Sequence, residues 1–198
     1  MDRRSALKKT GLLAGAAVAM PSILSILQGC KSEPRLTWQP EFFTEVEAQT
    51  IASLVDVILP RTDTPGALDV KVDVFIDKII AKTYDAEGQG NMRKDIATFN
   101  ADCKENYGAI FSDLDEKEKI AVLKEAEKTS GTFNPGIWGK TIGVQEPIGF
   151  YRSLKATAIW AYTTSEEIGE KVLNYLPVPG NFEGCVPVSE VGNKWSLG

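Results

Sequence analysis

Residues 44–60 read TEVEAQTIASLVDVILP, and this run has the sequence marks of an amphipathic α-helix. Thr44 and Glu47 are spaced as a capping box, in which each side chain bonds the backbone amide of the other residue. Phe43, just before the cap, can pack on the first turn as a hydrophobic staple. Pro60 cannot continue the backbone bonding and should end the helix. The expected buried face consists of Ile51, Leu54, Val55, Val57 and Ile58.

Four further segments repeat apolar side chains at helical spacing, and strand patterns are scarce. Asp115 and Glu118 make a second capping box, and Ser165 can cap a short additional helix. The sequence therefore predicts an all-α fold, a single irregular bundle of about five or six helices with an extended C-terminal tail from about residue 175. The four segments cover about residues 72–81, 90–107, 115–131 and 145–161.

The first thirty residues contain two targeting signals in series. Arg3 and Arg4 precede an uncharged run from Thr10 to Gly29, which is typical of the twin-arginine signal that exports folded proteins. An ordinary secretory signal is the alternative, although the run is weakly apolar. Leu27-Gln28-Gly29-Cys30 resembles a lipoprotein cleavage box, so Cys30 is the expected lipidation site.

These signals predict three parts of the chain. Residues 1–29 are the expected signal peptide, residues 30–41 a tether, and residues 42–198 the helical domain with its tail. We therefore expect the mature protein in the cell envelope, on the periplasmic side, held to the membrane by its N-terminal lipid.

The expected mature chain is acidic. Residues 1–29 hold four of the 22 basic residues and one of the 27 acidic residues, so the remainder has a net charge of −8. Nucleic acids and anionic lipid surfaces both require clustered Lys and Arg. The sequence therefore predicts no nucleic-acid partner and no broad electrostatic contact with lipid.

Histidine is absent from the whole sequence. Histidine-bearing zinc, iron and haem sites are thereby excluded, as are nucleophiles that depend on a histidine base. No Cys-x-x-Cys pair, Gly-x-Gly-x-x-Gly motif or phosphate-binding loop occurs. We expect no catalytic residue, no bound cofactor and no metal site in this chain.

Two cysteines remain if Cys30 carries lipid. Cys103 continues the helical spacing of Ile96 and Phe99, so it should be buried. Cys185 lies in a tail rich in proline and glycine and should be exposed. It is a candidate for an intersubunit disulfide, and a free or internally paired thiol is the alternative.

Two irregular segments flank the predicted helices. Residues 60–67 contain Pro65-Gly66, which predicts a type II turn with positive φ at the glycine. A rigid connection between helices explains this loop without a function, and a metal at Asp63 is not expected. The tail beyond Leu176 cannot form its own core, so it either lies across its own domain or docks on a partner.

The order of these features resembles one family, the small subunit, called subunit 3 or gamma, of gluconate 2-dehydrogenase-type membrane sugar dehydrogenases. The chain departs from that family in its lipobox, so the anchoring prediction rests on Leu27–Cys30 alone. The features that carry the resemblance are the twin-arginine start, Pro60–Ala67, the helix with Phe150-Tyr151, Thr164-Ser165-Glu166 with Gly169, and the tail Tyr175–Cys185.

The resemblance implies a division of labour within a complex. The large subunit is an FAD-containing flavoprotein of the glucose-methanol-choline type that oxidises a sugar, sugar acid or alditol, and a cytochrome c subunit often accepts the electrons. The small subunit is non-catalytic and supplies the export signal for its folded partner. In this chain the expected partner contacts are Phe150, Tyr151, Trp160, Tyr175, Phe182 and Trp195, with Cys185 as the covalent link.

Two other classes of function remain open from sequence. The chain could be a stand-alone envelope lipoprotein that binds a small ligand or has a structural role. An enzyme acting alone would need paired carboxylates, and the sequence shows no such motif.

Overall fold

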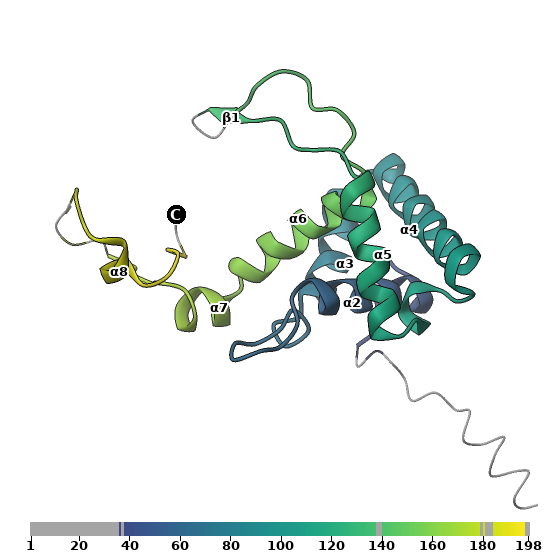
Figure 1. Ribbon diagram of the computed structural model, residues 1–198, viewed down its shortest axis with the longest axis horizontal. Coiled ribbons are helices and arrows are strands. Elements are labelled where there is room, and N and C mark those ends of the chain that lie inside the picture. The colour runs from purple at the N-terminus through teal and green to yellow at the C-terminus, as the bar shows by residue number, and fades with distance from the viewer. Residues whose placement is uncertain (1–35, 37, 138–139, 179, 181–183, 197–198) are drawn as a thin grey trace, which may run out of the picture. The chain divides into compact units, whose positions relative to one another are not determined.

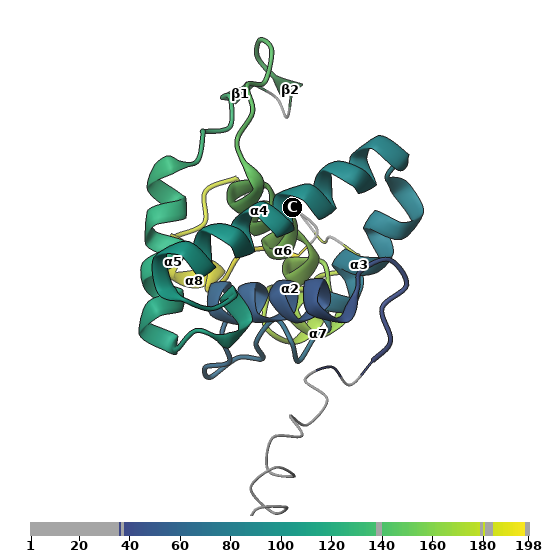
Figure 2. The same ribbon diagram turned by 90° about the vertical axis from the view of Figure 1, so that its right-hand side faces the viewer.

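The computed structural model describes residues 36, 38–137, 140–178, 180 and 184–196. Within these ranges the chain is helical, which confirms the all-α prediction, and the only strands are two short ones that form a hairpin (Figures 1 and 2). The elements are α2 (Glu45–Ile58), α3 (Val72–Thr83), α4 (Ala86–Tyr107), the 3-10 helix η1 (Phe111–Asp113), α5 (Glu116–Thr129), β1 (Gly136–Ile137), β2 (Lys140–Thr141), α6 (Phe150–Thr163), α7 (Glu166–Lys171) and α8 (Val188–Val191).

Both predicted capping boxes are present. Thr44 Oγ1 accepts the Glu47 N–H at 3.4 Å, while Glu47 Oε2 accepts the Thr44 N–H at 2.8 Å. Asp115 and Glu118 make the equivalent pair at the start of α5. Ser165 occupies the N-cap position of α7, but its hydroxyl donates to the Tyr162 carbonyl at 2.7 Å, so the predicted capping bond is absent.

The predicted starts of α4 and α6 were wrong, in opposite directions. Helix α4 begins at Ala86 because Asp85 caps it, accepting the Gly88 N–H at 2.8 Å. Helix α6 begins only at Phe150, since the residues before it belong to the hairpin connection. Gly149 precedes α6 with φ of 83°, a conformation that side chains with a Cβ rarely adopt.

Helix α6 lies at the centre of the bundle and packs on α2, α3, α4, α5 and α7. Figures 1 and 2 show it among these helices. A buried polar link joins three other elements: Asn100 donates to Thr50 Oγ1 at 2.9 Å and accepts the Phe111 N–H at 3.2 Å. The most deeply buried apolar side chains include Ile51, Leu54, Val55, Ile76, Ile80, Ile96, Phe111, Leu154, Ala158 and Ile168.

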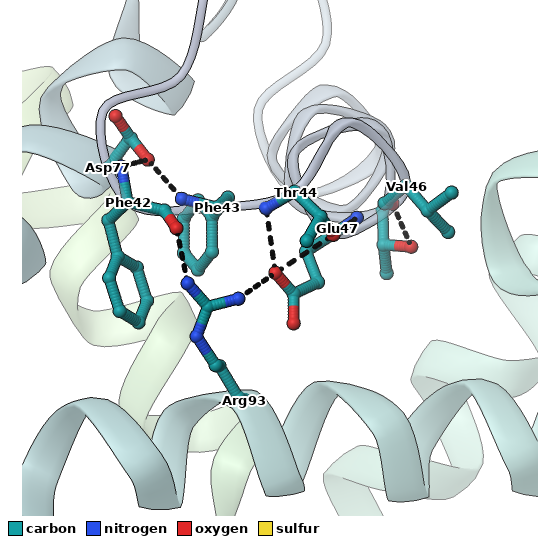
Figure 3. Close-up of polar contacts among 8 residues, drawn as sticks. Phe42, Phe43, Thr44, Val46, Glu47, Asp77 and Arg93 are labelled. Atoms are coloured by element: carbon teal, nitrogen blue, oxygen red, sulfur yellow. Dashed lines mark hydrogen bonds and ion pairs between the residues drawn. The ribbon is translucent and has the colours of Figure 1, made fainter.

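Two charged side chains fix the segment that leads into α2 (Figure 3). Asp77 of α3 is fully buried, and its carboxylate accepts the N–H groups of Glu41, Phe42 and Phe43 at 2.7, 3.1 and 2.8 Å. Arg93 of α4 donates to the Phe42 carbonyl at 2.6 Å and to Glu47 Oε2 at 2.8 Å. Its guanidinium also lies 4.3 Å from the centre of the Phe42 ring.

The connection between α2 and α3 corrects the predicted type II turn. Gly66 does not have positive φ; it is needed because a Cβ there would lie 2.6 Å from the Arg61 backbone nitrogen. Asp69 organises the loop by accepting the Gly66 N–H at 2.7 Å and the Arg61 Nε–H at 2.7 Å. The Arg61 bond, followed by the Gly66 bond, lowers the pKa of the Asp69 carboxyl.

The end of the tail is bonded to the chain just after α7. The Asn174 N–H donates to the Lys194 carbonyl at 2.9 Å, and the Ser196 N–H donates to the Asn174 carbonyl at 3.0 Å. The Asn193 side chain adds a bond to the Val172 carbonyl at 2.7 Å. Residues 193–196 therefore lie against their own domain. Among the described helices, none combines the length and hydropathy that crossing a bilayer requires.

Candidate docking surface

Two of the three predicted contact residues of α6 fall on opposite sides of the helix. Tyr151 and Trp160 are nine residues apart, which at about 100° per residue places them half a turn from each other. Tyr151 is buried and Phe150 is half-buried, whereas Trp160 is 50% exposed. The structure therefore separates the predicted contacts into a buried side and an exposed side.

Trp160 forms an exposed aromatic pair with a residue of α3. The rings of Phe75 and Trp160 meet edge to face, with centroids 5.4 Å apart, and Phe75 is 37% exposed. Ile159 is exposed beside Trp160 in the chain. We refer to Phe75, Ile159 and Trp160 as the aromatic patch.

The half of α6 that carries the aromatic patch is uncharged. Residues 156–165 read ATAIWAYTTS and contain no Asp, Glu, Lys or Arg. Exposed helix faces of soluble proteins are usually polar or charged. Exposed aromatic side chains are typical of contacts between proteins, where Trp is enriched among the residues that contribute most to binding.

The charges of α6 lie at its other end and are already paired. Glu127 of α5 accepts Lys155 Nζ at 2.8 Å and Arg152 Nη2 at 2.9 Å. The Lys155 bond lowers the pKa of the Glu127 carboxyl most strongly. These ion pairs hold the first half of α6 to α5.

The tail exposes further apolar side chains after Asn174. Tyr175, Leu176 and Trp195 are each a little under half exposed, and Val178 and Val188 are almost fully exposed. Asn174 holds this segment by donating its side-chain amide to the carbonyls of Val191 and Asn193. The predicted tail contacts Tyr175 and Trp195 are therefore available at the surface.

The two cysteines differ as predicted. Cys103 is buried in α4, and burial raises the pKa of its thiol to about 11, with a smaller contribution from Asp102. Cys185 is exposed and free. The predicted site residues Arg3, Arg4, Cys30 and Phe182 lie outside the described residues.

Of the aromatic patch, the sequence predicted Trp160 as a contact residue but not Phe75. The spacing of apolar residues predicts a helix over about 72–81, but Val74, Phe75 and Ile76 are consecutive and cannot all face one core. That crowding was the available signal that one of them is exposed. In the described part of the chain, no group of three or more Cys, Asp or Glu is placed to hold a metal ion.

Comparison with protein families gives one match. The family model described as gluconate 2-dehydrogenase subunit 3 matches residues 45–180, which run from the start of α2 through the aromatic patch into the tail. The chain belongs to the gluconate 2-dehydrogenase subunit 3 family. No curated protein and no solved structure shows significant similarity to it.

Membership in the gluconate 2-dehydrogenase subunit 3 family makes the chain a subunit of a dehydrogenase complex. The match includes α6 and the aromatic patch, whereas Arg3, Arg4, Cys30, Cys185 and Trp195 lie outside it. The export, anchoring and disulfide predictions therefore rest on this chain's own residues.

Proposed function

We propose that this chain is the non-catalytic small subunit of an FAD-dependent sugar, sugar-acid or alditol dehydrogenase, which it escorts across the membrane, anchors and stabilises. The single observation that supports this most is the aromatic patch on an uncharged half-helix within the family match. A subunit whose task is binding needs such a surface and needs no catalytic group.

Export in the folded state accounts for the N-terminal signal. A flavoprotein has to fold around FAD where the cofactor is made, so it must cross the membrane already folded. A partner without its own signal can do so only while bound to a chain that carries one. Arg3 and Arg4 supply that signal in this proposal, and Cys30 supplies the lipid that retains the complex at the periplasmic face.

The aromatic patch and the tail form the proposed contact with the large subunit. Burying Phe75, Ile159 and Trp160 against a partner removes their apolar surface from water, which contributes about 25 cal/mol for each Å² buried. Tyr175, Phe182 and Trp195 of the tail extend the contact. A cytochrome c subunit would join the same complex through the large subunit.

Cys185 is the proposed covalent link. Its exposed thiol and a partner cysteine would lose two electrons and two protons to an oxidant of the envelope, forming one S–S bond. Non-reducing electrophoresis of the purified complex tests this link, because Cys185→Ser should abolish a band at the summed mass while leaving the non-covalent complex intact.

The escort role is tested by the export of the partner. The Arg3→Lys, Arg4→Lys double variant should leave both this chain and the flavoprotein in the cytoplasm, since the twin-arginine pathway requires the arginine pair. A Lys8→Arg, Lys9→Arg double variant is the matched control and should be exported. Fractionation followed by immunoblotting gives the result. A flavoprotein that reaches the periplasm alongside the twin-lysine variant contradicts the proposal.

A further inference from the structure

A second surface of the molecule is a groove on the other side of α6 from the aromatic patch. Its volume is about 720 Å³, and it is lined by α4, α5 and the first residues of α6. Both α4 and α5 pack on α6, and the groove runs between them. Tyr151, which faces away from Trp160, contributes to the lining.

The two walls of the groove have matching helical spacing. On both α4 and α5 the lining residues recur every three or four positions. Each helix therefore lines the groove with one continuous stripe of side chains. The α4 stripe extends from Asp95 to Tyr107, about 18 Å at 1.5 Å per residue. The α5 stripe consists of Val122, Glu125, Ala126 and Thr129.

The groove combines an apolar interior with acidic edges. Phe99, Phe150 and Val122 are half-buried within it. Its charged lining residues are Asp95, Asp102 and Glu125, and none is basic. Among the described residues Asp95 and Asp102 make no ion pair, while the exposed Glu125 is 3.0 Å from Lys128, an arrangement that contributes little.

We propose that this groove is the docking site for an amphipathic helix of a protein partner, with an apolar stripe facing the groove and Lys or Arg on its flanks. Two facing stripes at helical spacing accept a third helix between them, because ridges of side chains on one helix pack into the grooves of another. The length of the α4 stripe corresponds to about three turns of the docked helix.

Charge complementarity selects a basic segment. The three carboxylates at the edges of the groove repel an acidic helix. They stabilise the bound state of a helix whose Lys and Arg side chains reach those edges. The inference does not depend on the identity of the partner, so it stands apart from the proposed flavoprotein contact at the aromatic patch.

Site-specific photo-crosslinking in the native host tests the groove. A benzophenone amino acid replaces Val122, which lines the groove, in the full chain; the control replaces Lys124, which is exposed and points away from it on α5. The expected result is a cross-link from position 122 but not from position 124. Mass spectrometry should place it in a segment of another protein that has helical apolar spacing flanked by Lys or Arg.

A charge-matched pair of variants tests the acidic edges. Asp95→Asn with Asp102→Asn should lower the cross-linking yield about fivefold, since both substitutions remove a carboxylate that faces the cations of the bound helix. Asp56→Asn with Glu87→Gln removes the same charge elsewhere and should leave the yield unchanged. Equal thermal melting of both variants excludes unfolding as the cause.

Four results overturn the inference: no cross-link at position 122, an intramolecular cross-link, a linked segment that is neither helical in pattern nor basic, or equal yields from the two charge variants. A cross-link to a basic helix of a protein that binds no flavin supports the groove as a docking site. The proposed flavoprotein contact is tested separately, at the aromatic patch. The two proposals therefore fail separately.

Discussion

At the scale of single residues, the buried Asp77 of α3 fixes the backbone of the segment that leads into α2. Its carboxylate accepts three backbone N–H groups where the chain enters α2, and no water is needed to satisfy them. A hydrogen bond to a charged group contributes about 1.5 to 3 kcal/mol, and a buried donor left without a partner costs about as much.

We therefore expect Asp77→Asn to lower the free energy of unfolding by about 2 to 3 kcal/mol, because the amide keeps one acceptor but turns its NH2 group toward amide donors. Urea denaturation followed by circular dichroism measures the change. Asp56→Asn, exposed on α2, is the control and should change the free energy by less than about 0.5 kcal/mol. Equal effects of the two substitutions would contradict the role assigned to Asp77.

Cys103 gives a prediction about pH. Burial raises the pKa of its thiol from 9.0 to about 11, so the folded chain retains a proton that the unfolded chain has lost in that interval. The stabilising contribution is complete below pH 9 and is lost as pH rises toward 11. The free energy of unfolding should fall over this range, and it should fall less in Cys103→Ala. Parallel curves for the two proteins would refute the assignment.

At the scale of elements, two glycines differ in whether the fold leaves room for a side chain. Gly66 lies where a Cβ would meet the Arg61 backbone nitrogen at 2.6 Å, whereas a Cβ at Gly90 within α4 would meet nothing within 4 Å. Gly66→Ala should lower the melting temperature, because backbone must move. Gly90→Ala should raise the free energy of unfolding by about 1 kcal/mol, the difference in helix propensity. Two changes of the same sign would disprove this reading of the loop.

The aromatic patch carries the prediction for binding. Trp160→Ser should weaken binding of the large subunit by about 30-fold or more, as expected when a central aromatic contact worth 2 kcal/mol or more is removed. Val46→Ser, on the exposed side of α2, is the control and should bind as the wild type does. Surface plasmon resonance with the isolated large subunit measures both. Unchanged affinity for Trp160→Ser would remove the patch from the interface.

Sequence reasoning was accurate where a complete capping box is present, as at the starts of α2 and α5. It was wrong where the local motif is incomplete or where nearby backbone decides: Asp85 caps α4 with Gly88, and not Glu or Gln, three residues on, and the Ser165 hydroxyl does not cap α7. Gly66 is set by the approach of Arg61, and the start of α6 is set by the hairpin before it.

The site was predictable only in part because it depends on contacts between helices that are far apart in the sequence. Trp160 and the tail residues could be named from composition, whereas the Phe75 to Trp160 pair requires knowing that α3 packs on α6. The groove was not foreseen because each of its walls reads as an ordinary amphipathic face. Only the fold shows that the two stripes line one groove.

At the scale of the whole molecule the chain is a helical subunit of the gluconate 2-dehydrogenase subunit 3 family with two proposed surfaces for binding other proteins. Its described residues contain no group that could hold a metal, and its sequence has no histidine. The central claim is that this chain acts, as proposed above, by associating with a cofactor-bearing partner.

Purification of the tagged chain from its own host tests that claim most directly, with absorbance used to detect flavin in the eluate and mass spectrometry used to identify the proteins. The account predicts a yellow eluate that contains an FAD-binding dehydrogenase subunit without a signal peptide of its own. A colourless eluate in which the chain is the sole protein would contradict it.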